Sequence, residues 1–172
     1  MKERAEKTVL EGLLSAMRAE HEGFHFYSIA ARNTEDEKGK AVFSQLADDE
    51  REHLAFLKAQ YASMQESGAP DQTVMLKDDK WAPKGSSPIF SDGLKSRVKD
   101  AHFEMTALSI GIQLELDAVK HYKQLSDEAE NAFVKRFFLQ LSEWESTHYQ
   151  ALLDQQQDLQ ESYWAGNGFS PL

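Results

Sequence analysis

The 172-residue sequence contains no cysteine. This absence excludes disulfides, thiolate zinc sites, iron–sulfur clusters and cysteine nucleophiles. Any metal that the chain binds must therefore use oxygen and nitrogen ligands.

Basic side chains are also scarce. The chain has 19 Lys and Arg against 29 Asp and Glu, which gives a formal net charge of -10. Because such a chain is repelled by phosphate backbones and anionic lipids, we expect neither nucleic acid nor a membrane as a partner. The sequence has no apolar run of about 18 residues and no signal-peptide pattern at its N-terminus, so we expect a cytoplasmic protein.

Proline and glycine are few, with 4 and 9 residues, and all four prolines lie outside the segments of helical periodicity. Two long stretches, about 2–66 and about 104–160, are therefore predicted to be helical. Each stretch has one internal break, so each is predicted to form a helical hairpin.

The breaks carry candidate helix caps. Within 33–37, Thr34 and Glu37 have the spacing of a capping box. In the second stretch, Ser126 and Asp127 offer caps near the break.

The connection between the hairpins, residues 67–103, is too long for a simple antiparallel turn. It is predicted to be irregular up to about 91, with a short helix at 92–100. A connection of this length can cross the length of a bundle. We therefore predict an all-α fold in a single domain over 1–172, an antiparallel four-helix bundle of two helical hairpins with a long crossover.

A shift of 95 residues superimposes the two hairpins, so the chain contains an internal repeat. Apolar residues recur at three- and four-residue spacing and form one buried stripe along each helix. The identities at this offset include Leu13 and Leu108, Glu20 and Glu115, Tyr27 and Tyr122, Phe43 and Phe138, Leu46 and Leu141, Glu50 and Glu145, His53 and His148, and Leu57 and Leu152.

Charged residues interrupt these stripes in both halves. Each half has one glutamate on its first helix and a Glu-x-x-His on its second, and residues three apart share a helix face. The two glutamates of a hairpin lie fifteen residues either side of its break, which places both about 22 Å from the turn. We expect six residues to meet at mid-bundle: Glu20, Glu50, His53, Glu115, Glu145 and His148.

Four carboxylates in a core are unfavourable unless cations neutralise them. Two divalent ions balance the four glutamates, and ligation by carboxylate and imidazole without sulfur suits iron, with manganese or zinc as substitutes. We expect Glu20 and Glu115 to be terminal ligands of separate ions, with Glu50 and Glu145 bridging. A metal-free interaction bundle would leave the four core glutamates unexplained.

The pattern Glu20, Glu50-x-x-His53, Glu115, Glu145-x-x-His148 resembles the ferritin-like di-iron carboxylate superfamily. The near-symmetric halves are most similar to its rubrerythrin branch, and the resemblance covers about 10–159. It implies a ferritin-like bundle with two irons at mid-bundle. It also implies an oxidoreductase of peroxidase or ferroxidase type, which reduces hydrogen peroxide with ferrous iron.

The sequence departs from full-length rubrerythrins in two respects. It lacks their cysteine-ligated rubredoxin domain, so electrons are expected from an external donor such as a rubredoxin or a reductase. Rubrerythrins also have an additional carboxylate one turn beyond the third-helix glutamate, where this chain has Ala118.

Aromatic residues suggest further roles. Tyr27 and Tyr122 each stand two turns beyond a terminal glutamate on the same face, so their hydroxyls can reach the metal ligands, or they are plain core residues. The tail 161–172 contains Tyr163, Trp164 and Phe169. We expect it to fold back on the bundle or to pack on another subunit, in a homodimer.

Three functions fit this pattern. The first is reduction of peroxide or dioxygen. The second is ferrous iron oxidation and storage, which requires a closed shell of many subunits. The third is hydroxylation of an organic substrate, which requires an apolar channel.

Overall fold

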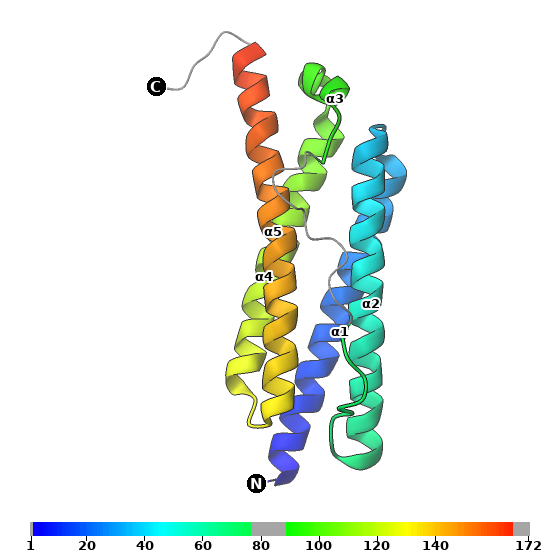
Figure 1. The fold of residues 1–172 in the computed structure, drawn as a ribbon, viewed down its shortest axis with the longest axis vertical. Coiled ribbons are helices and arrows are strands. Elements are labelled where there is room, and N and C mark those ends of the chain that lie inside the picture. Colours follow the sequence, from blue (N-terminus) through cyan, green and yellow to red (C-terminus); the bar gives the residue numbers. More distant parts are fainter. Residues whose placement is uncertain (1, 77–88, 167–172) are drawn as a thin grey trace.

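The computed structural model describes residues 2–76 and 89–166, and these residues contain helices and no strand (Figure 1). The four long helices are α1 (Lys2–Asn33), α2 (Glu37–Ser67), α4 (His102–Glu128) and α5 (Ala132–Gly166). The short helices α3 (Asp92–Ser96) and η1 (Val98–Asp100) lie at the end of the crossover, where a short helix was predicted. The predicted all-α fold is confirmed.

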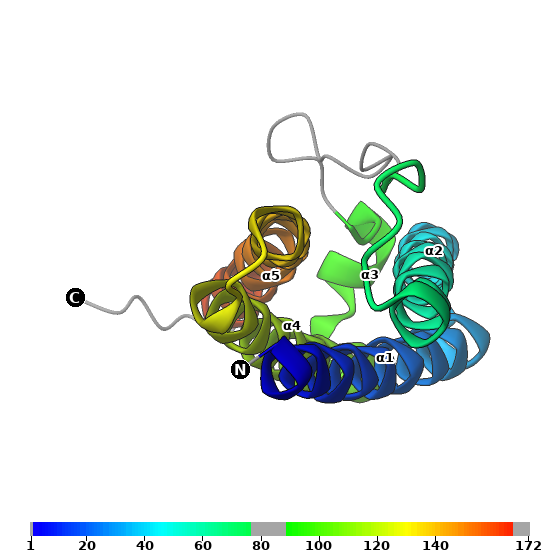
Figure 2. The ribbon, with the colours of Figure 1, turned by 90° about the horizontal axis from the view of Figure 1, so that it is seen from below.

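The long helices pair as two hairpins, α1 with α2 and α4 with α5. Seen along the bundle, α1 and α4 lie side by side, with α2 and α5 on the same side of that pair (Figure 2). The result is the predicted four-helix bundle of two hairpins with a long crossover. Within the described ranges, none of the helices has an apolar stretch long enough to cross a membrane.

The cap of α2 is Asp36, and the predicted capping box that begins at Thr34 is wrong. The Asp36 carboxylate accepts a hydrogen bond from Gly39 N at 2.9 Å. Thr34 is buried, and its hydroxyl donates to the Glu104 carboxylate in the first turn of α4 at 2.8 Å. Its hydroxyl therefore joins the two hairpins and is not used as a cap.

The second break differs from its prediction in the same way. Asn131 caps α5, because its side-chain oxygen accepts from Phe133 N at 2.9 Å and Val134 N at 3.1 Å. Ser126 and Asp127 lie inside α4, so they are not caps. The Ser126 hydroxyl instead donates to the Lys135 carbonyl at 2.9 Å, which ties α4 to α5.

Helix α5 is longer than predicted. It continues past residue 160 to Gly166, so the predicted tail is helical up to that residue. Tyr163 and Trp164 lie on this last part of α5, 40% and 45% exposed, with ring centroids 5.4 Å apart. Phe169 lies outside the described residues.

Two apolar clusters fill the bundle, one at each end. The α3-side core includes Tyr27, Phe43, Phe90, Leu108 and Leu152. The turn-side core, beside the α4–α5 turn, includes Leu13, Leu57, Tyr122, Phe138 and Leu141. The buried polar residues of the predicted centre lie between these two cores.

Candidate metal centre

All six predicted residues meet in the middle of the bundle, and every long helix contributes. None of the six is more than 4% exposed. They are Glu20 from α1, Glu50 and His53 from α2, Glu115 from α4, and Glu145 and His148 from α5.

The six residues form two overlapping groups of four, within each of which the candidate ligand atoms lie within 4.8 Å of one another. The first group is Glu20, Glu50, His53 and Glu145, and the second is Glu50, Glu115, Glu145 and His148. Glu50 and Glu145 belong to both groups. This sharing is what two bridging carboxylates between two ions require; that the residues bind metal stays a prediction.

Both histidines turn the same ring atom toward the carboxylates. His53 Nδ1 lies 3.2 Å from Glu20 Oε2 and 3.1 Å from Glu145 Oε1. His148 Nδ1 lies 3.2 Å from Glu145 Oε2. The two oxygens of Glu145 therefore face different histidines, as expected for a carboxylate that lies between two ions.

The tyrosines contact the glutamates crosswise. The Tyr27 hydroxyl donates to Glu115 Oε1, and the Tyr122 hydroxyl donates to Glu20 Oε1. Each tyrosine therefore contacts the first-helix glutamate of the other hairpin, because α1 and α4 run antiparallel and side by side. Burial and the neighbouring carboxylates raise the pKa of both phenols well above the ordinary value, so both remain donors.

Burial and mutual repulsion dominate the electrostatics of the glutamates. Burial, and then the charge of Glu145, raises the pKa of Glu50 and of Glu115 well above that of an exposed glutamate. Burial acts in the same direction on Glu145, but the two histidines outweigh it and lower its pKa.

The histidines respond in the opposite direction. Burial alone would lower their pKa, but carboxylates outweigh it and raise both values well above normal. The carboxylates are chiefly Glu20 and Glu145 for His53, and Asp49 and Glu145 for His148. The cluster thus attracts positive charge, which protons or metal ions can supply.

The residues present fit a pair of iron or manganese ions. Four carboxylates and two imidazoles provide oxygen and nitrogen donors of the kind these ions prefer. Glu145 Oε1 is buried and, although His53 Nδ1 lies 3.1 Å away, it accepts no hydrogen bond from the described residues, which suits an atom that binds a cation.

A pocket of about 380 Å³ leads from the α1–α4 surface to the four glutamates. Its exposed lining residues are Arg18, Glu22 and Asp117. Gly23 and Ala118, at matching positions of the repeat, line it deeper. A Cβ on Gly23 would lie 3.3 Å from Glu50 Cδ, so this glycine keeps room beside a candidate ligand.

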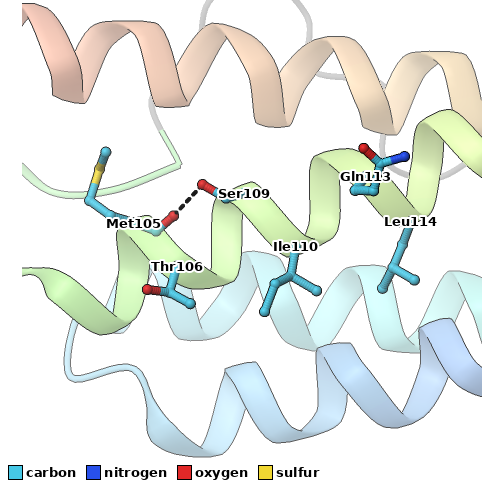
Figure 3. Close-up of a pocket in the computed structure, with 6 residues that line it drawn as sticks. All are labelled: Met105, Thr106, Ser109, Ile110, Gln113 and Leu114. Atoms are coloured by element: carbon cyan, nitrogen blue, oxygen red, sulfur yellow. Dashed lines mark hydrogen bonds between the residues drawn. The ribbon is translucent and has the colours of Figure 1, made fainter.

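A second hollow, of about 490 Å³, lies along α4 (Figure 3). Its lining residues are Met105, Thr106, Ser109, Ile110, Gln113 and Leu114. None of these side chains titrates, and the Ser109 hydroxyl donates to the Met105 carbonyl at 3.0 Å. This hollow adjoins the first pocket through Leu114 but provides no metal ligand or acid–base group.

Asp49 is a residue that the sequence interpretation did not place in the site. It is 6% exposed, and its Oδ2 lies 3.7 Å from His148 Nε2. A signal for it exists in the sequence, since Asp49 stands three residues after Leu46 and four before His53, at the spacing of one helix face.

Comparisons with known proteins identify a family. No curated protein and no solved structure matches the chain. A family model described as Rubrerythrin matches residues 11–102 and 106–165, which is most of the sequence and includes all six residues of the centre. The chain therefore belongs to the rubrerythrin family.

Proposed function

We propose that this protein binds two iron ions at the six mid-bundle residues and reduces hydrogen peroxide or dioxygen with ferrous iron. The observation that carries the proposal is the pair of overlapping four-residue groups that share Glu50 and Glu145. Membership of the rubrerythrin family supports it.

The arrangement suggests a role for each residue. Glu20 and His53 would hold one ion, Glu115 and His148 the other, and Glu50 and Glu145 would lie between them. When bound there, two ferrous ions would supply the two electrons needed to convert one hydrogen peroxide and two protons into two water molecules. Manganese or zinc can occupy the same donors, but zinc cannot donate electrons.

The residues around the ligands orient them and restrict access. Tyr27 and Tyr122 hold the terminal glutamates by hydrogen bonds, which fixes their carboxylate planes. The pocket between α1 and α4 gives a small oxidant a route to the glutamates. Its charged outer residues, Arg18, Glu22 and Asp117, disfavour an apolar organic substrate.

A rubredoxin-type centre requires cysteine, and the sequence has none. We therefore propose a separate electron donor, such as a rubredoxin or a reductase.

An anaerobic ferrous titration of metal-stripped protein tests the proposal. We expect saturation near two ions per chain, and less in Glu50→Ala and in His148→Ala. Glu143→Ala is the matched control, because Glu143 is exposed on the same helix two residues before Glu145. The proposal would be refuted if the protein bound no ferrous ion, or if neither Glu50→Ala nor His148→Ala reduced the number of ions bound.

The oxidant is then identified with the diferrous protein. We expect peroxide or dioxygen to oxidise it faster than the same concentration of free ferrous ion, in stopped-flow absorbance. Oxidation no faster than that of the free ion would eliminate the redox function while leaving the metal site.

A second candidate is oxidation of ferrous iron as substrate. The exposed carboxylates of Glu22 and Asp117 favour it, because they line the outer part of the pocket and attract cations. Addition of many ferrous ions per chain distinguishes the two functions. Continued oxidation with retained ferric iron in a large assembly supports storage, whereas precipitation after two ions per chain contradicts it.

A further inference from the structure

The two histidines of the centre have different neighbours besides the glutamates. Since each ring turns Nδ1 toward the carboxylates, Nε2 points outward. Beyond His148 Nε2 lies the Asp49 carboxylate, with Oδ2 at 3.7 Å. His53 instead has the Trp144 indole stacked on its ring, with centroids 5.2 Å apart and 25° between the planes.

Asp49 and Trp144 occupy the same position of the repeat. They are 95 residues apart, and each immediately precedes the glutamate of a Glu-x-x-His. The six candidate ligands match pairwise between the two halves, but these two neighbours do not. The asymmetry of the centre therefore includes a carboxylate on one side and an aromatic ring on the other.

Asp49 is a buried carboxylate with only part of its hydrogen-bonding capacity used. Its Oδ1 accepts from Gln45 Nε2 at 2.8 Å. Its Oδ2 is buried and accepts no hydrogen bond from the described residues. Such a group is costly in a protein core, so its position needs a reason.

Metal ligation at His148 supplies that reason. An imidazole that binds a metal through Nδ1 carries its proton on Nε2, where it is a hydrogen-bond donor. That N–H would point toward Asp49, and a small rotation of either side chain closes 3.7 Å to a hydrogen bond. A carboxylate in this place fixes the ring and makes Nδ1 a stronger donor to the metal.

Trp144 cannot act on His53 in this way. Its indole nitrogen is a hydrogen-bond donor only, and the side chain carries no negative charge. The stacked ring restricts the orientation of His53 but does not make its Nδ1 more basic.

We infer that Asp49 is a positioning residue for His148, and that it makes the two metal positions unequal. The ion held by Glu115 and His148 is bound more tightly than the ion held by Glu20 and His53. This inference rests on the proposed function, in which the six residues bind two ions.

Cobalt(II) binding to single-histidine variants tests the inference. His53→Ala retains the position with His148, and His148→Ala retains the other. In the His53→Ala protein, Asp49→Asn is expected to weaken cobalt binding about 10- to 100-fold. In the His148→Ala protein, the same substitution is expected to change it by no more than about twofold.

Two further variants separate positioning from a structural role. Asp49→Glu keeps a carboxylate and is expected to restore part of the affinity lost in Asp49→Asn. Trp144→Phe keeps a ring over His53 and is expected to leave cobalt affinity within about twofold in the His148→Ala protein. Circular dichroism and thermal unfolding of the metal-free variants establish that each one folds.

Equal weakening in both backgrounds, or no weakening in His53→Ala, would overturn the inference. If the single-histidine variants bind too weakly, Mössbauer spectra of the protein with both histidines and iron-57 decide. Asp49→Asn should shift one iron doublet, and a shift of both or neither overturns the inference. If the protein with unchanged sequence binds no metal, the proposed function is refuted together with the inference. If it binds metal but Asp49→Asn lacks the expected effects, only the inference is refuted.

Discussion

The two hairpins are alike where they face the centre and differ where they face the crossover. Their inner stripes share the glutamates, histidines and tyrosines of the candidate metal centre. At their turns, Asp36 and Gly39 of the first hairpin correspond to Asn131 and Val134 of the second.

The crossover accounts for this difference, because its end packs on the first turn. Ser91 N donates to Asp36 Oδ1 at 3.2 Å, and the Phe90 ring lies against Gly39. The second turn is instead held by the Asn131 cap and the Ser126 hydroxyl within its own hairpin. The doubled candidate centre therefore depends on similarity only along the faces that meet, and the ends of the hairpins can differ.

The largest effect on stability is expected when Gly39 is replaced by valine, the residue type of Val134 at the matching position of the second hairpin. A Cβ on Gly39 would lie 2.3 Å from Phe90 Cε1, so Gly39→Val forces the fully buried Phe90 ring out of place. We expect the free energy of unfolding to fall by about 3 kcal/mol, measured by urea denaturation.

Phe90→Ala provides the control for this clash. If the clash is the cause, the losses in the double variant sum to less than those of the two single variants. Strictly additive losses would show that Gly39 is needed for another reason.

Two glutamines at matching positions anchor the two ends of the crossover, and their removal should rank next. Gln155 Oε1 accepts hydrogen bonds from Ile89 N and from Phe90 N. Gln60 Oε1 accepts from the half-buried Asp71 N at 3.0 Å, and Gln60 Nε2 donates to the Asp71 carbonyl at 2.9 Å. Since Gln155→Ala strands buried N–H groups, it should destabilise by about 2 kcal/mol, and Gln60→Ala by about 1 kcal/mol.

Hydrogen exchange checks this order. The Ile89 and Phe90 amides should exchange faster in Gln155→Ala, and not in a variant of the exposed neighbour, Gln157→Ala. A larger effect of Gln60→Ala would mean that the start of the crossover is the more important anchor.

The crosswise tyrosines should give effects that are equal to each other and smaller than that of Gln155→Ala. Tyr27→Phe and Tyr122→Phe each remove one hydrogen bond to a buried carboxylate, so each should lower the stability of metal-free protein by about 1.5 kcal/mol. Thermal unfolding measures both, with Tyr61→Phe as a control on a partly exposed tyrosine. Unequal losses would show that the two halves of the centre are energetically different even without metal.

The repeat made most of this architecture predictable from sequence. Helical periodicity and the placement of proline indicated four long helices and a crossover, and the doubled Glu-x-x-His indicated which faces meet. Because six polar residues interrupt apolar stripes at one height, the candidate centre followed from spacing alone.

The sequence predictions fail where contacts between distant parts of the chain determine the local structure. Thr34 has the sequence of a cap, but its hydroxyl bonds Glu104, a residue 70 positions away in sequence. The crosswise tyrosine contacts depend on how the hairpins dock, which spacing within a hairpin cannot show. Asp49 lies outside the doubled pattern of glutamates and histidines, and only the approach of α5 makes it a neighbour of His148.

The last predicted effect is also small and concerns the cap of α2 and its dependence on pH. Burial opposes ionisation of Asp36, but hydrogen bonds from Ser91 and from Gly39 N outweigh it, so its pKa is lower in the folded protein. Its contribution to stability is therefore present above the unfolded pKa, about 4, and is lost as the pH falls through the folded value.

Asp36→Asn introduces the residue type of Asn131 and should lower the free energy of unfolding by about 1 kcal/mol at neutral pH, because an amide is a weaker acceptor than a carboxylate. Urea denaturation between neutral and acid pH should show the variant and the unchanged protein converging as the carboxyl group protonates. If the difference in free energy of unfolding between the two proteins stays constant with pH, Asp36 acts by its shape and not by its charge. The two turns would then differ less than their hydrogen bonds suggest.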